Sequence, residues 1–210
     1  MTTPNITLAA PKPTEQLTFV STERKETPAW KRATDILLSF AFLVLLLPIL
    51  LVLAVAIKLD SKGPVFFRQF RIGLGGIPFT IWKLRSMKAD VSPYAQSPNT
   101  SSDPRLTRVG RLIRRISVDE LPQLWNVLRG DMSLVGPRPE MPYIVEHYSA
   151  EQRMRLAIKP GITGLWQISH HRSSPIHENL QHDLYYIKHC SMALDFSILI
   201  RTIFAVARGV

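Results

Sequence analysis

The sequence predicts a mainly helical, membrane-associated chain with one small β-hairpin. Three observations predict this fold class: an uncharged apolar run over 36–57, two β-forming segments around a glycine cluster within 64–84, and basic amphipathic stretches after residue 105. With 210 residues, the chain suits one hydrophobic core better than two full domains.

The apolar run is the clearest single element. It has 22 residues from Ile36 to Ile57 and carries no charge. As a helix it would reach roughly 33 Å, enough to cross a bilayer core of about 30 Å. Pro48 lies near its middle, where it removes a backbone hydrogen bond and bends a helix. Basic residues flank both ends, and basic flanks prefer the cytoplasm. A bent span and a re-entrant helix with both ends cytoplasmic are therefore both compatible with the sequence.

The charge and composition limit the partners. The formal net charge is +10, and residues 1–30 contribute nothing to it because their acids and bases balance. Such a surface favours phosphate groups, in nucleic acid, anionic lipid or a small substrate. Since no nucleic-acid-reading module is recognisable, we expect no nucleic-acid partner. The single cysteine, Cys190, excludes an internal disulfide and fits a reducing compartment.

Three regions follow from these patterns. Residues 1–30 are rich in Thr and Pro without a helical period, so we expect a disordered tail. Residues 31–60 are expected to form the membrane helix, with a break at Pro48 if it is re-entrant. Residues 61–210 are expected to form one domain together with that helix.

The soluble region is predicted to begin with a hairpin. Residues 64–84 carry β-formers on both sides of Gly73, Gly75 and Gly76. A hairpin turn is favoured over a nucleotide-binding loop because no helix signal follows the glycines. A polar, proline-rich loop is expected over 90–104.

Helices are predicted in the remainder. Within 105–131 arginines interleave with aliphatic residues, which gives a helix one cationic and one apolar face. That face suits either solvent or anionic lipid headgroups. Residues 178–189 read as a helix. The final apolar-faced helix, packing or interfacial, has Asp195 as its candidate N-cap.

Two adjacent acids give the strongest chemical signal. Ser117 and Glu120 have capping-box spacing, which by itself explains Glu120 as part of a helix start. Asp119 is left without such an explanation. In the first turn of a helix it would meet free N–H groups and a partial positive charge that could also receive a phosphate. Arg114, about one turn upstream, would help to hold the anion. Adjacent carboxylates also suit Mg²⁺, so Asp119 and Glu120 are the candidate metal ligands.

A second motif follows about 20 residues later. In Gly136-Pro137-Arg138-Pro139, both prolines fix φ, and Pro139 also drives Arg138 toward an extended backbone. The result is either an ordinary exposed turn or a stiff mount for a guanidinium that binds phosphate.

From about Lys31 onward the chain resembles the bacterial sugar transferases, small monotopic phosphoglycosyl transferases. The resemblance is carried by four segments: KRATD, FTIWKLRSM, SVDELPQLWNVLRGDMSLVGPRP and KPGITGLWQI. It implies an α+β catalytic domain with a small hairpin, interfacial amphipathic helices and a re-entrant N-terminal helix that breaks at a Ser-Pro pair. Here Pro48 matches and Leu47 replaces the serine. The resemblance raises re-entry above the span.

The resemblance also implies a reaction. The first acid of the pair, here Asp119, attacks the β-phosphate of a UDP-sugar, and UMP leaves. The phosphosugar on the aspartate then passes to polyprenyl (undecaprenyl) phosphate. Mg²⁺ is the expected cofactor, and Glu120 assists the second step or binds the metal. Arg114 and Arg138 match arginines near the phosphates, and Lys83 matches a lysine of the same region.

The implied setting is the cytoplasmic face of the bacterial inner membrane, with lipids as partners and a product used in exopolysaccharide, O-antigen, capsule or glycoprotein glycan synthesis. A homo-oligomer is compatible with the sequence, and the sugar cannot be read from it. Two other readings stay open: a membrane-anchored scaffold that binds anionic lipid, and a Mg²⁺-dependent phosphatase of lipid diphosphates.

Overall fold

The computed structural model describes residues 24–207 except 96, 97, 99, 101, 170–173 and 175–178. Most of the tail predicted over 1–30 lies outside these residues. The helices are α1 (Ala29–Asp60), α2 (Arg108–Arg115), α3 (Gln123–Arg129), α4 (Pro142–Val145), α5 (Ala150–Arg153), α6 (Leu180–His189) and α7 (Met192–Ala207). The strands are β1 (Phe66–Ile72), β2 (Pro78–Leu84), β3 (Ser133–Val135) and β4 (Gly161–Thr163), and 3-10 turns are η1 (Leu74–Gly76), η2 (Val118–Glu120) and η3 (Met154–Ala157). The mainly helical α+β class is confirmed.

The hairpin is confirmed as predicted. β1 and β2 pair antiparallel, with Phe67 opposite Lys83 and Arg71 opposite Phe79. The turn needs glycine because Gly75 and Gly76 have φ of 65° and 82°, which other residues rarely adopt. Since side chains alternate across a strand, Lys83 and Arg71 lie on the same face of the hairpin.

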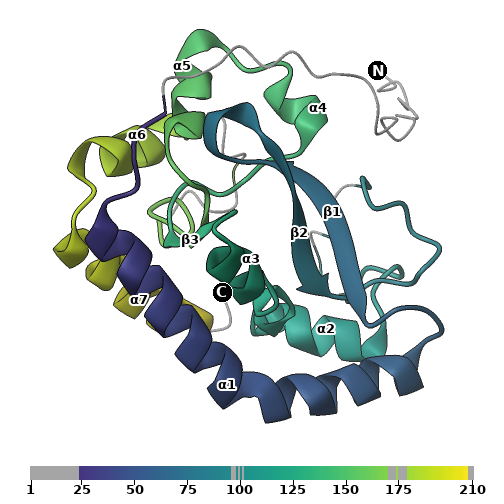
Figure 1. Ribbon diagram of the computed structural model, residues 1–210. Helices are drawn as coiled ribbons and strands as arrows, with labels where there is room; N and C mark the ends of the chain where they lie inside the picture. Colours follow the sequence, from purple (N-terminus) through teal and green to yellow (C-terminus); the bar gives the residue numbers. More distant parts are fainter. Residues whose placement is uncertain are drawn as a thin grey trace.

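Helix α1 contains the apolar run and Pro48. Figure 1 shows that α1 changes direction part way along while staying helical. A proline inside the helix explains such a bend, since it lacks the N–H for one hydrogen bond and crowds the preceding turn. Among the described residues α1 is the one helix long and apolar enough to cross a membrane, and only 6% of its most apolar window is buried. Re-entry of this helix stays a prediction.

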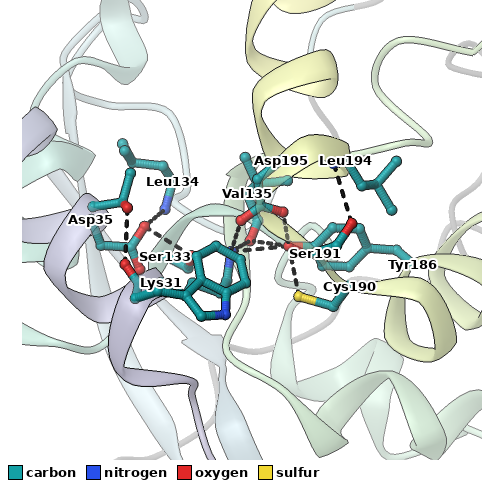
Figure 2. Close-up of polar contacts among 12 residues, drawn as sticks. Lys31, Asp35, Ser133, Leu134, Val135, Tyr186, Cys190, Ser191, Leu194 and Asp195 are labelled. Atoms are coloured by element: carbon teal, nitrogen blue, oxygen red, sulfur yellow. Dashed lines mark hydrogen bonds and ion pairs between the residues drawn. The ribbon is translucent and has the colours of Figure 1, made fainter.

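The N-terminal end of α1 is held by buried polar contacts (Figure 2) in addition to the packing of Leu38 against the core. Lys31 Nζ lies 2.5 Å from Asp195 Oδ2 and donates to the hydroxyl of Tyr186 and the carbonyl of Val135, each at 3.0 Å. One turn later, Asp35 accepts hydrogen bonds from Ser133 Oγ and the Leu134 amide. These bonds join α1 to β3, α6 and α7.

The prediction that Asp195 caps the last helix is wrong. Helix α7 begins at Met192, and Ser191 Oγ accepts the hydrogen bond from the Leu194 amide at its start. Asp195 lies within the first turn, where its carboxylate pairs with Lys31 and accepts from Tyr186 instead.

The basic stretch within 105–131 is also more broken than predicted. It forms α2, the short turn η2 and then α3, rather than one helix. The Asp60 carboxylate accepts a hydrogen bond from Val109 at the start of α2, and Ile57, Leu84 and Ile113 form a small core there. This packing places η2 beside the end of β2.

Candidate functional site

The predicted site residues of η2, β2 and the proline-flanked loop come together around Glu120. Its Oε1 lies 2.6 Å from Lys83 Nζ and 2.8 Å from an Arg138 nitrogen, and its Oε2 lies 3.3 Å from the other terminal nitrogen of Arg138. Residues 37 and 18 positions away in sequence thus meet at one carboxylate.

The predicted capping box at Ser117 is wrong. Ser117 has φ 55° and ψ 19°, a left-handed backbone that is rare outside glycine, and its side chain caps nothing. Pro122 lacks the amide that a continuous helix would need, so η2 is a single 3-10 turn and regular helix begins at Gln123. Glu120 therefore binds cations instead of its own backbone, and Asp119 does not lie in the first turn of a regular helix.

Charge determines the state of Glu120. Burial acts to raise the pKa of this carboxyl group, but Arg138 and Lys83 outweigh it and hold the pKa well below its usual range. Burial also lowers the pKa of Lys83, partly opposed by Glu120. At neutral pH Glu120 is an anion committed to two cations.

Asp119 is in the opposite condition. It is only 6% exposed, and none of the described residues donates a hydrogen bond to its carboxylate. Burial raises its pKa to about 6, with Glu120 adding to the rise and Lys83, Arg114 and Arg138 opposing it. The physical result is a desolvated carboxylate, mostly ionised at pH 7, that is more basic than an ordinary aspartate and close to several cations.

Two cavities meet at this carboxylate. The hairpin cavity, about 330 Å³, lies between the hairpin and the segment that follows it, and the helix cavity, about 620 Å³, extends toward α1 and α7. Lys83, Arg114 and Asp119 line both. The helix cavity is otherwise lined mostly by apolar residues, among them Leu46, Ile116, Leu121, Leu124, Ile162, Trp166, Ile168, Ala205 and Val206. Such volumes are those of small-molecule sites.

Of the predicted residues, Pro48 is the one that lies away from this cluster, inside α1. Arg114 is close enough for its charge to act on Asp119. Its guanidinium makes no hydrogen bond to the described residues, which leaves it available to a ligand.

Sequence reasoning missed Arg71. It lines the hairpin cavity and donates to the Pro139 carbonyl at 3.2 Å. Burial, with repulsion from Arg138, lowers its pKa to about 10, so it stays charged at neutral pH. The available signal was the strand pattern, because alternation puts Gln69 and Arg71 on the face of β1 that a hairpin normally keeps apolar.

Asn126 was missed as well. Its amide accepts a hydrogen bond from the Trp82 amide at 3.1 Å and donates to the Thr80 carbonyl at 2.7 Å, so it replaces a neighbouring strand along β2. This fixes α3 against β2 immediately beside Lys83. No local pattern predicts it, because the contact joins residues 44 positions apart.

A model of the family described as bacterial sugar transferase matches residues 26–209. The chain belongs to the bacterial sugar transferases. The match includes α1 and every site residue named above, so the apolar helix and the site belong to the same family segment.

Curated bacterial sugar transferase relatives carry related names. The chain is 43% identical over 183 residues to UDP-glucose:undecaprenyl-phosphate glucose-1-phosphate transferase of Klebsiella pneumoniae, covering 83% of this chain and 39% of the relative. It is 41% identical over 185 residues to UDP-N-acetylgalactosamine-undecaprenyl-phosphate N-acetylgalactosaminephosphotransferase of Aeromonas hydrophila, covering 85% and 44%. It is 41% identical to exopolysaccharide production protein PSS of Rhizobium leguminosarum bv. phaseoli, covering 82% and 92%. The first two relatives are thus more than twice as long as the matched segment.

Proposed function

We propose that this chain transfers a sugar 1-phosphate from a UDP-sugar to undecaprenyl phosphate and releases UMP, with Asp119 as the covalent nucleophile. The observation that carries the proposal is the Asp119 carboxylate itself: buried, without a hydrogen bond from the described residues, and shared by both cavities. The names of the relatives, which differ in sugar but agree on undecaprenyl phosphate, support the substrate classes.

In the first step an Asp119 oxygen attacks the β-phosphorus of the UDP-sugar. A bond forms between that oxygen and phosphorus, and the bond from phosphorus to the bridging oxygen of UMP breaks. Charge develops on the phosphoryl oxygens and on UMP, and Lys83, Arg114 and Arg138 surround this position with positive charge. A desolvated aspartate of raised pKa is a better nucleophile than a hydrated one.

In the second step an oxygen of undecaprenyl phosphate attacks the same phosphorus and expels Asp119. The products are an undecaprenyl-diphosphate sugar and the free carboxylate. The apolar lining of the helix cavity, which runs from Asp119 to α1 and α7, suits an isoprenoid acceptor that arrives from lipid. The hairpin cavity, lined by Arg68, Arg71 and Lys88 among others, suits the nucleotide diphosphate.

Mg²⁺ is the expected cofactor, and the donor set is compatible with it. Asp119 has a carboxylate free of hydrogen bonds from the described residues, and Glu120 Oε2 makes only the longer, 3.3 Å contact with Arg138. These two carboxylates would hold the ion together with phosphate oxygens. Bound Mg²⁺ would neutralise charge on the diphosphate and on the leaving UMP.

Location at the cytoplasmic face of the inner membrane, with α1 re-entrant, belongs to the same proposal. It is supported by the exposed apolar side chains of α1 and α7 and by the bend at Pro48. Both substrates then meet at headgroup depth, since one is soluble and the other is a lipid.

The test separates the two steps. Purified protein in lipid nanodiscs is incubated with Mg²⁺ and individual UDP-sugars without acceptor. We expect about one UMP per active site and a mass increase of one sugar phosphate on the intact chain, followed by multiple turnovers once undecaprenyl phosphate is added. Asp119→Asn should give neither UMP nor the adduct.

Other results would contradict the proposal. Folded protein that releases no UMP from a broad panel of UDP-sugars is no transferase of this kind. Phosphate release from undecaprenyl diphosphate without any UDP-sugar would instead support a lipid diphosphate phosphatase. Vesicle binding with neither activity would support a scaffold.

A further inference from the structure

The backbone around Arg138 is held in place by hydrogen bonds to its carbonyl groups. Pro137 and Pro139 have no amide hydrogen, so this segment can offer few donors of its own. Instead, four consecutive carbonyls accept hydrogen bonds from other elements. Pro137 accepts from the Gly161 amide at 2.9 Å, Pro139 from Arg71 at 3.2 Å, and Glu140 from the Ile72 amide at 3.0 Å.

The remaining carbonyl, that of Arg138 itself, is bound by a buried arginine. Arg155 of η3 donates from a terminal nitrogen to the Arg138 oxygen at 3.0 Å, and its side chain is only 3% exposed. Its other donors reach Glu140 Oε2 at 2.9 Å and Asp183 Oδ2 of α6 at 2.5 Å. Tyr148 donates to Glu140 and accepts from Arg155. One guanidinium thus connects α6 and the residue after the proline motif to the Arg138 backbone.

Burying this cluster of charges contributes less to the free energy of folding than apolar packing often does. Buried ion pairs lose hydration energy that their mutual attraction often fails to return, and apolar replacements are frequently as stable. Arg155 lines neither the hairpin cavity nor the helix cavity, so it does not reach the reacting groups. A fixed fork that binds a carbonyl and two carboxylates at once gives geometry that apolar packing cannot give.

We propose that Arg155 is a positioning residue: with Asp183 and Glu140, it locks the Arg138 backbone so that the Arg138 guanidinium meets Glu120 and the substrate diphosphate in one fixed orientation. This inference rests on the proposed function for its catalytic consequence. Because an error of about 1 Å in a charged group can cost on the order of 100-fold in rate, the expected effect lies in catalysis more than in folding.

The test uses Arg155→Lys, which keeps the positive charge but cannot serve three partners at once. We expect kcat for UMP release to fall by about 10- to 100-fold, with a smaller change in the KM of the UDP-sugar. In an Arg138→Ala background, the same Arg155→Lys change should cost less than about threefold, because the residue it positions is gone. If the loss of kcat in the double variant equals the product of the two single losses, the proposal is wrong. Such independence would mean that Arg155→Lys acts through a general loss of structure and not through Arg138.

A matched control separates positioning from stability. Asp195→Asn weakens another buried ion pair, with Lys31, which contacts the carbonyl of Val135 but none of the four residues of the proline motif. It should lower the melting temperature at least as much as Arg155→Lys while leaving kcat within about threefold of wild type. If the two variants lose kcat in proportion to their melting temperatures, Arg155 is structural only.

A readout that needs no activity distinguishes failure of this inference from failure of the proposed function. Amide hydrogen exchange should speed up in Arg155→Lys at Gly161 and Ile72, whose amides donate to the carbonyls of Pro137 and Glu140, while the other β1 and β2 amides keep wild-type protection. If exchange changes locally but the wild-type protein releases no UMP, the positioning inference stands and the proposed transferase activity is wrong. Unchanged exchange at Gly161 and Ile72 in an active enzyme would overturn the positioning.

Discussion

At the scale of single residues, the two adjacent acids have opposite electrostatic conditions. Glu120 is an ion-paired anion whose pKa is held low by Arg138 and Lys83 despite its burial. Asp119 is desolvated without hydrogen bonds from the described residues, and its pKa is about 6. Neighbouring carboxyl groups whose pKa values are pushed apart are typical of sites with divided chemical roles. This division supports the proposal that Asp119 is the nucleophile and that Glu120 has an electrostatic role.

The first prediction concerns pH. Because Asp119 must be ionised to attack, kcat/KM for the UDP-sugar should fall about tenfold per pH unit below roughly pH 6, the pKa that burial gives this group. An ordinary aspartate would place this fall near pH 4. Rates of UMP release between pH 5 and 8 measure it, and a flat profile down to pH 5 would exclude Asp119 as the titrating nucleophile.

The second prediction concerns stability. The folded pKa of Asp119, about 6, lies above the ordinary value of 3.8, so the charged form disfavours folding above pH 6 and protonation favours it as pH falls toward 4. Asp119→Asn removes that charge without changing shape. Its melting temperature at pH 7.5 should equal or exceed that of wild type although activity is lost. A clear drop would mean that the carboxylate has a structural partner.

At the scale of elements, the position of Lys83 depends on α3. The Asn126 side chain bonds to β2 on both sides of Ile81, and the Lys83 that follows is thereby held against Glu120. A helix side chain here takes the place of a third strand.

The third prediction tests this contact. Asn126→Ala should lower the free energy of unfolding by about 1–3 kcal/mol, because it leaves the Trp82 amide and the Thr80 carbonyl without partners, and it should lower kcat by displacing Lys83. Chemical denaturation and UMP release measure the two effects. Gln123→Met is the matched control on α3, since Gln123 is also buried but its amide nitrogen has no partner among the described residues. Equal losses in both variants would contradict the special role of Asn126.

Sequence predicted those elements whose signals are local. The hairpin, the apolar helix and the helix near 180–189 follow from periodicity and turn residues, and these are confirmed. The two cap predictions, at Ser117 and Asp195, are wrong because tertiary partners compete for the same side chains: Lys31 and Tyr186 bind Asp195, and Lys83 and Arg138 bind Glu120.

The site residues also divide into those with a local sequence signal and those that depend on long-range contacts. Asp119 stood out because the capping-box spacing of Ser117 and Glu120 left it unexplained, and Arg138 stood out because two prolines flank it. Asn126 and Arg155 have no such local signal, and their meaning appears only when residues 44 and 17 positions away become neighbours.

At the scale of the whole molecule, many large apolar side chains of α1 and α7 are exposed. Leu37, Leu45 and Val52 of α1 and Phe196 and Ile203 of α7 are all at least 60% exposed. Figure 1 shows the N-terminal part of α1 beside α7. Exposed apolar side chains in this number mark contact with lipid or protein.

The fourth prediction separates this surface from the chemistry. In Phe196→Ser/Ile203→Ser/Phe204→Ser, transfer to undecaprenyl phosphate in vesicles should fall by about tenfold or more. Each side chain would lose roughly 1.5–3 kcal/mol of burial in lipid, and α7 lines the helix cavity, which is the proposed acceptor site. The first burst of UMP should be unchanged. Met154→Ser, at an exposed apolar residue of η3, is the control and should alter neither step.

The buried Lys31 has a practical consequence for dissecting this chain. A membrane anchor is usually cut away to obtain a soluble fragment, but here that cut would leave Asp195 and the Tyr186 hydroxyl buried without their cation. It would also remove the carboxylate of Asp35 from the amide of Leu134. A fragment starting after Asp60 should therefore be recovered as aggregate, whereas a chain that keeps residues 29–60 and is given detergent should be recovered folded. Helix α1 should therefore be treated as part of the folded domain.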